Sequence, residues 1–185
     1  KEKYGFMSKS IKLFEEQYPN HKEDELISYL KGNALLRQYI SQKNSEYLNT
    51  SLVIFEELAE RSQNYELKKS LYMYLIHFYH HNKNIIKSLE NSKRLYVIGT
   101  RNFDEEAIYF SSEVILNSLA QLRQKDKIEK FLQEPIVKKF LNEQIGIGYK
   151  IYVMLLNKQY DEIITYYNSI KSGLQQPADP SILFN

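Results

Sequence analysis

The histidines are the first residues whose type and spacing could support chemistry. His77 and His81 are four residues apart, and side chains at this spacing share one face of a helix, as paired metal ligands often do. No His-Glu-x-x-His pattern accompanies them, and the sequence does not reveal a carboxylate that would act as a third ligand. We therefore interpret both histidines as polar side chains on a helix surface, and we expect neither a metal nor a cofactor.

Motifs of catalysis are also missing from the sequence. Ser, His and Asp are present, but no Gly-x-Ser-x-Gly elbow exposes a nucleophile and no Gly-rich loop could hold a phosphate. The Gly-Ile-Gly segment at 146–148 lacks the third glycine and the preceding strand of a dinucleotide site, so we interpret it as a flexible helix entry. The adjacent acids Glu56 and Glu57, and likewise Glu105 and Glu106, are interpreted as solvated helix faces or helix-start charges. The sequence predicts a protein that is not an enzyme.

Composition narrows the remaining functions. With 25 Lys plus Arg against 23 Asp plus Glu, the net charge of +2 is too small for a groove that follows nucleic-acid phosphates. No apolar run approaches the roughly 18 residues that a membrane span needs. The chain has no cysteine, which excludes disulfides and thiolate-bound metals and favours a reducing compartment. We therefore expect a cytoplasmic location, no membrane contact and no direct contact with nucleic acid.

Helices must position whatever site the chain has. Glycine and proline number only 6 and 4, no Asn-Gly or Asp-Gly hairpin signal joins two alternating apolar runs, and apolar residues recur at steps of three and four. Asp104 is a good helix start, because a carboxylate there satisfies free backbone amides. These patterns predict helices near 23–41, 44–61, 65–81, 84–98, 104–123, 126–141, 144–157 and 160–171, with a ninth at 4–17.

The predicted helices fall into pairs that open near residues 23, 65, 104 and 144, at the spacing of about 40 residues typical of helical repeats. The segment Leu-Asn-Lys-Gln-Tyr-Asp-Glu-Ile-Ile-Thr-Tyr-Tyr at 156–167 resembles the turn and second helix of the tetratricopeptide motif, and Leu-Lys-Gly-Asn-Ala at 30–34 is similar to its first helix. The resemblance implies an all-α, right-handed superhelix of antiparallel helix pairs, a tetratricopeptide-like α-α solenoid, over residues 1–174. Residues 175–185 contain two prolines and are expected to form an extended tail.

A repeat of this kind binds its ligand on the concave surface lined by the first helix of each pair. Asn33, Asn117 and Asn157 fall in or beside predicted first helices, and an amide can both donate to and accept from a peptide backbone. Tyr149 could add a rigid aromatic surface to such a groove. We therefore predict a peptide-binding site that contains these four residues. The alternative is that the asparagines bond locally within their own helices and that most tyrosines fill the spaces between helices.

One group of proteins shares several of these features. Leu-Asn-Ser-Leu at 116–119, followed by Tyr-Lys-Ile-Tyr-Val-Met-Leu-Leu at 149–156, resembles the repeat domain of the peptide-pheromone receptors of low-GC Gram-positive bacteria, the Rgg, PrgX and PlcR kind. The resemblance implies a bacterial transcription regulator that senses a short peptide and forms a homodimer. The chain begins at Lys1 without an initiator Met, so we expect that a segment precedes it, and the resemblance implies that this segment holds a DNA-binding module. The alternative function is a general protein interaction scaffold.

Overall fold

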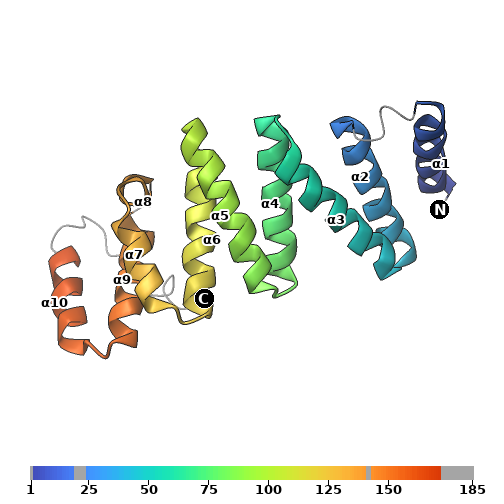
Figure 1. Ribbon diagram of the computed structural model, residues 1–185. Helices are drawn as coiled ribbons and strands as arrows, with labels where there is room; N and C mark the ends of the chain where they lie inside the picture. The colour runs from blue at the N-terminus through green and yellow to red at the C-terminus, as the bar shows by residue number, and fades with distance from the viewer. Residues whose placement is uncertain (1, 19–23, 141–142, 172–185) are drawn as a thin grey trace. The chain divides into compact units, whose positions relative to one another are not determined.

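The computed structural model describes residues 2–18, 24–140 and 143–171, and every regular element in these ranges is an α-helix (Figure 1). The all-α fold class predicted from the spacing of apolar residues is therefore confirmed. Within the described ranges the helices are α1 (Glu2–Gln17), α2 (Glu25–Gln42), α3 (Ser45–Arg61), α4 (Tyr65–His81), α5 (Ile85–Asn102), α6 (Glu105–Gln121), α7 (Lys125–Gln133), α8 (Pro135–Phe140), α9 (Glu143–Leu156) and α10 (Tyr160–Lys171).

The chain forms two compact units, Lys1–Ile98 and Gly99–Asn185, and each is described by itself. In the first unit α1 packs on α2, α2 on α3, and α3 on α4. Apolar side chains from successive helices meet between these pairs and exclude water, which is the main source of stability in such a fold. The most deeply buried are Ala34, Phe55, Leu58, Ala59, Leu71, Leu75, Ile76 and Leu95.

A glycine allows α2 and α3 to approach closely. A Cβ atom at Gly32 would overlap the ring of Phe55, so no larger residue fits without moving that ring. At the same contact the buried Ser51 hydroxyl donates a hydrogen bond to the Gly32 carbonyl at 2.8 Å. The Phe55 ring then meets Tyr74 of α4 edge-on, with ring centroids 5.4 Å apart. Gly32, within the Leu-Lys-Gly-Asn-Ala segment, is thus the position where α2 packs closely against α3.

In the second unit α6 packs on α7 and α8, α7 packs on α8 and α9, and α9 packs on α10. Gly99 begins this unit, and a Cβ atom there would lie 2.9 Å from the Ala107 Cβ of α6. Asp104 caps α6 as predicted, because its carboxylate accepts a hydrogen bond from the Ala107 N–H at 2.9 Å. The core of the unit consists of Ala107, Ile108, Ile115, Leu116, Leu119, Ile128 and Val137.

The single helix predicted over 126–141 is wrong. The structure ends α7 at Gln133 and begins α8 at Pro135. Proline has no N–H to continue the helix, and its ring forces the preceding residue out of the helical region. Glu134 accordingly has φ −60° and ψ 128°. Pro135 is visible in the sequence, so this break could have been predicted.

The turn inside each helix pair has a recurring form. A basic residue takes the left-handed conformation, with φ between 54° and 60°, and a residue with an amide side chain follows it. This two-residue feature recurs at intervals of 35 to 40 residues, which is about the period expected of a helical repeat. In three of the four turns the amide residue's N–H bonds to the carbonyl five residues earlier, at 2.9–3.0 Å, which is the Schellman arrangement that closes a helix C-terminus. The pairs are Lys43 and Asn44, Lys83 and Asn84, Arg123 and Gln124, and Lys158 and Gln159.

The extended tail at 175–185 lies outside the described residues. Among the described helices, none combines the length and the apolar character that crossing a bilayer requires.

Candidate functional site

The four residues predicted to bind peptide do not all belong to one unit. Asn33 lies on α2 in the first unit, where its side-chain N–H donates to the Tyr29 carbonyl of the same helix at 2.9 Å. Asn117 lies on α6 in the second unit, and its side-chain oxygen accepts a hydrogen bond from Gln121 one turn later at 2.8 Å. Both asparagines therefore make the local helix bonds that we considered as the alternative to ligand binding.

Tyr149 lies on α9 and faces α6. Burial, and secondarily the negative charge of Glu113 on α6, raises the pKa of Tyr149 to about 12 from 10.0. Its neighbour Tyr152 donates a hydrogen bond to the Ala120 carbonyl at the end of α6, at 2.9 Å. Glu113, whose charge acts on Tyr149, lies one turn before Asn117 on α6.

Asn157 follows the last residue of α9 and connects this helix to α7. Its side-chain oxygen accepts from the Lys125 ammonium at 2.8 Å, and its N–H donates to the Glu129 carboxylate at 3.3 Å. Both polar groups of this amide therefore have partners within the unit. Asn157 thereby holds Glu129, which lines a groove of this unit.

This groove, here called the C-terminal groove, lies among α7, α8, α9 and α10 and has a volume of about 1010 Å³. Its size is near the upper end of the range common for ligand sites. Apolar side chains contribute part of its lining: Leu132, Ile147, Val153, Met154, Tyr166 and Ile170. Charged side chains of both signs contribute another part: Asp126, Glu129, Lys130, Lys138, Lys150 and Glu162.

Two details show how the C-terminal groove is built. The Lys150 ammonium lies 4.2 Å from the centroid of the Tyr166 ring, which connects α9 to α10 by a cation–π contact. Gly146 lines the groove, and a Cβ atom built there would meet nothing within 4 Å. The predicted role of the Gly-Ile-Gly segment as a helix entry fits its place in α9, but the sequence did not show that Gly146 borders open space.

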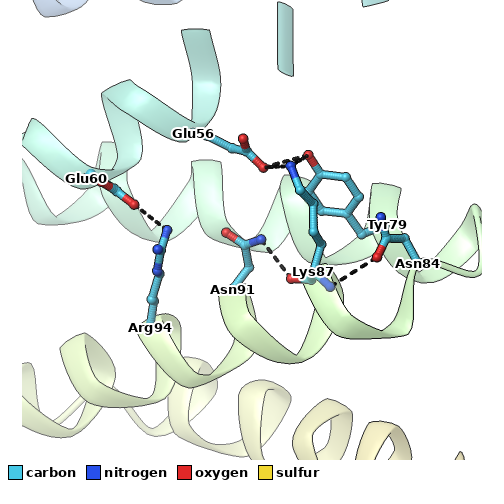
Figure 2. A network of polar contacts seen from close by, with 7 residues as sticks. All are labelled: Glu56, Glu60, Tyr79, Asn84, Lys87, Asn91 and Arg94. Carbon is cyan, nitrogen blue, oxygen red and sulfur yellow. Dashed lines mark hydrogen bonds and ion pairs between the residues drawn. The ribbon is translucent and has the colours of Figure 1, made fainter. Parts of the chain in front are cut away.

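A second, smaller groove of about 380 Å³ lies in the first unit among α3, α4 and the start of α5. At its centre, Figure 2 shows Glu56, Tyr79 and Lys87 pointing toward one another from three helices. The Tyr79 hydroxyl donates to the Glu56 carboxylate at 2.6 Å, and the Lys87 ammonium donates to the same oxygen at 2.8 Å. Glu56, which we interpreted as part of a solvated face, is half-buried with 27% of its side chain exposed, and side chains of α4 and α5 bond to it; Glu57 is exposed.

The electrostatics of this cluster oppose catalysis by its members. The hydrogen bond to Glu56 raises the pKa of Lys87 above 10.5, so the amine stays protonated and is a poor nucleophile or base. Burial, and the hydrogen bond donated to Glu56, raise the pKa of Tyr79 above 10.0. One further ion pair, Arg94 with Glu60 at 2.5 Å, joins α5 to α3 beside the cluster (Figure 2). The cluster thus connects helices.

The histidines give no sign of a metal site in the described residues. His77, His80 and His81 are all exposed on α4. In the part of the chain that the structure describes, no group of three or more His, Cys, Asp or Glu side chains could hold a metal ion.

The C-terminal groove is the better candidate for ligand binding. It is larger than the groove beside Glu56, and it combines apolar and charged side chains in its lining, whereas Glu56, Tyr79 and Lys87 at the centre of the smaller groove bind one another. Comparison with known proteins adds no assignment: no protein-family model matches the sequence, no curated protein matches it, and no solved structure matches the fold.

Proposed function

We propose that the chain is a non-catalytic repeat domain that binds a peptide, or a peptide segment of a partner protein, in the C-terminal groove. The groove carries this proposal, because it joins apolar side chains with lysines and carboxylates in a volume of about 1010 Å³. Apolar side chains of a peptide would be buried there, while the charges and amides would pair with polar groups of the peptide.

The proposed architecture is a tetratricopeptide-like stack of helix pairs. It is supported by the order of packing inside each unit and by the four basic turn residues Lys43, Lys83, Arg123 and Lys158, which recur at nearly constant intervals. Two of these turns belong to each unit. Repeats of this kind leave surfaces that commonly bind extended chains.

The regulatory role is proposed from the resemblance to peptide-pheromone receptors. In that case the domain would sense a peptide in the bacterial cytoplasm, act as a homodimer and pass the signal to a DNA-binding segment. Asn33 and Asn117 each form a hydrogen bond within their own helix. We therefore propose the C-terminal groove as the peptide site, in place of the site predicted from these two residues. Tyr149 and Asn157 would support the groove by fixing α9 against α6 and α7.

One observation favours the alternative of an interaction scaffold. The outer face of α10 exposes an apolar stripe with the spacing of one helix face, in which Tyr160, Ile164 and Tyr167 are 59%, 60% and 47% exposed. Such a stripe, at the last helix of a stack, suits contact with another protein surface.

Gly146 offers a direct test. A phenylalanine at this position would fill part of the groove, because its Cβ would meet no atom within 4 Å. Gly146→Ala is the matched control, since it also removes the glycine from the helix but adds only a methyl group to the groove. The measurement is the melting temperature of each variant with a library of short synthetic peptides, because a ligand that prefers the folded state raises it.

We expect particular peptides to raise the melting temperature of the parent chain and of Gly146→Ala, and to lose this effect with Gly146→Phe. A ligand present at about 100 times its dissociation constant stabilises by about 2.7 kcal/mol. Equal shifts in all three proteins would place the peptide elsewhere. Shifts in none of the three proteins would leave the scaffold function.

A further inference from the structure

The charged side chains that line the C-terminal groove are sorted by sign along its length. Three carboxylates, here called the acidic end, are those of Asp126, Glu129 and Glu162. Asp126 lies in the first turn of α7, and Glu162 lies in the first turn of α10. Asn157, in the turn between α9 and α10, bonds to Lys125 at the start of α7 and to Glu129. The start of α7 therefore lies beside this turn, and the three carboxylates gather there.

Three lysines, here called the basic end, extend away from this turn. They are Lys130, Lys138 and Lys150. Lys150 precedes Asn157 by seven residues, which is about 10 Å along the axis of α9. Lys138 lies in α8, and Figure 1 shows α8 at the end of α7 opposite the turn between α9 and α10. Lys130 directly follows Glu129 in α7 and marks the boundary between the two ends.

Helix polarity explains part of this sorting. A helix favours carboxylates in its first turn and ammonium groups in its last turn, because its N-terminus carries a partial positive charge and its C-terminus a partial negative one. Asp126 and Glu162 are in first turns, and Lys130 is in the last turn of α7. All six charged side chains are exposed, and among the described residues no ion pair joins the acidic end to the basic end. Both groups of charges therefore act on whatever enters the groove.

We propose that the C-terminal groove selects an extended peptide that has a basic and an acidic side chain separated by about three apolar or small residues. The basic side chain lies at the acidic end, and the acidic side chain lies at the basic end. An extended chain advances about 3.3 Å per residue, so charges four residues apart are separated by about 13 Å. Val153 and Met154, between Lys150 and Asn157 in α9, line the groove where the apolar residues would lie. This inference rests on the proposed function and names the class of peptide.

The sorting of charges disfavours ligands that have a single charge sign. A wholly acidic peptide would meet like charges at Asp126 and Glu162, and a wholly basic peptide would meet them at Lys138 and Lys150. Like charges brought together at an interface weaken binding and exclude wrong partners. The charges would therefore contribute mainly to specificity and orientation, while the apolar lining would contribute most of the affinity.

Four capped peptides test the charge selection directly. They share the middle Leu-Ala-Leu and differ at the two ends, which are Lys and Glu, Lys and Lys, Glu and Glu, or Gln and Gln. Acetylated and amidated termini leave only the side-chain charges. Dissociation constants from NMR titration of the full chain should be about fivefold to tenfold lower for the Lys and Glu peptide than for the two single-sign peptides. Equal constants for the four peptides, or a preference for one single-sign peptide, would overturn the proposal.

A charge-reversed variant tests the assignment of the basic end. Lys130→Glu with Lys138→Glu should bind the Lys and Lys peptide most tightly, because both of its ends then meet carboxylates. Lys127→Glu with Lys171→Glu makes the same change in net charge at exposed lysines of this unit that do not line the groove. This control should keep the preference of the parent chain for the Lys and Glu peptide. The same change of preference in both variants would show that net charge, and not the groove, selects the peptide.

The peptide library separates failure of this inference from failure of the proposed function. Library peptides that raise the melting temperature of the parent chain but not of Gly146→Phe, without any charge preference among the four capped peptides, would sink the charge selection alone. No binding by the capped peptides and no shift with the library would sink the proposed function, and this inference with it.

Discussion

The α3–α4–α5 region and the α9–α10 region are both built from consecutive helices, yet they bury their side chains very differently. In the first, Leu58 and Leu75 are 0% exposed, and polar side chains such as Glu56 bind across helices. In the second, α10 has no fully buried described side chain and borders a groove of about 1010 Å³. The first region is built for stability, and the second leaves surface available for a ligand.

The difference arises from which side chains close the space between helices. Where the first region meets α2, the ring of Phe55 fills the space over Gly32, and the Ser51 hydroxyl bonds α3 to the Gly32 carbonyl of α2. In the second region Gly146 faces open space. There α9 and α10 are joined by the cation–π contact between Lys150 and Tyr166, and not by a buried apolar contact at these positions. Binding sites need such incompletely packed surfaces, since a fully packed core has no room for a ligand.

The largest expected effect comes from truncating the closed core. Leu75→Ala should lower the free energy of unfolding by about 2–5 kcal/mol, because it leaves a cavity where the leucine is 0% exposed. Ile164→Ala, on the 60% exposed outer face of α10, should cost less than about 0.5 kcal/mol. Urea denaturation followed by circular dichroism measures both. Similar costs at the two positions would contradict the contrast between the regions.

The two glycines should respond with opposite signs. Gly32→Ala would push the new Cβ into the Phe55 ring and should destabilise by about 1–3 kcal/mol. Gly146→Ala meets open space and should stabilise by about 0.5–1 kcal/mol, since alanine lowers the entropy cost of the helix. Thermal unfolding of the two variants beside the parent chain checks the signs. Destabilisation by Gly146→Ala would mean that the groove is closed at this position.

The last expected effect appears only at alkaline pH and is centred on Tyr149. Its pKa is raised from 10.0 to about 12, so the folded chain holds the phenolic proton after the unfolded chain has released it. The stability linked to this proton is complete below pH 10 and is lost as the pH rises toward 12. Tyr149→Phe should therefore lose less stability than the parent chain between these pH values.

Tyr160→Phe, at a tyrosine that is 59% exposed, is the matched control for this measurement. The readout is the urea midpoint at a series of pH values above 9. An identical alkaline loss in the parent chain and in Tyr149→Phe would show that the α6–α9 contact does not bury the hydroxyl. A smaller loss in the Tyr160→Phe control as well would show that the effect is general to tyrosine removal.

Much of the local structure could be predicted from the sequence. Helix α4 was predicted at 65–81, and its bounds are Tyr65–His81. The start of α6 at Asp104 was predicted from its carboxylate and is confirmed by its hydrogen bond to the Ala107 N–H. These features depend on neighbours within one or two helical turns, which a single sequence displays. The break before Pro135 was missed although its cause is equally local.

The grooves could not be predicted in the same way. Glu56 binds Tyr79 and Lys87, which are 23 and 31 residues away in the chain, and no sequence spacing marks that meeting. Nor did the sequence show that Asn33 and Asn117 would bond within their own helices. A basic residue followed directly by an amide residue, as at Lys83 and Asn84, recurs in the sequence and could have located the turn inside each helix pair more accurately.

The sequence by itself determined that the chain is helical and where most helices begin and end, because apolar periodicity, caps and the few glycines and prolines act over short distances. Only the tertiary structure decided which polar side chains are covered and where space is left open. Those outcomes depend on how helices distant in sequence pack, and packing depends on the combined shapes of many side chains. Glu56 came to bond with Tyr79, and Gly146 came to face a groove, for that reason.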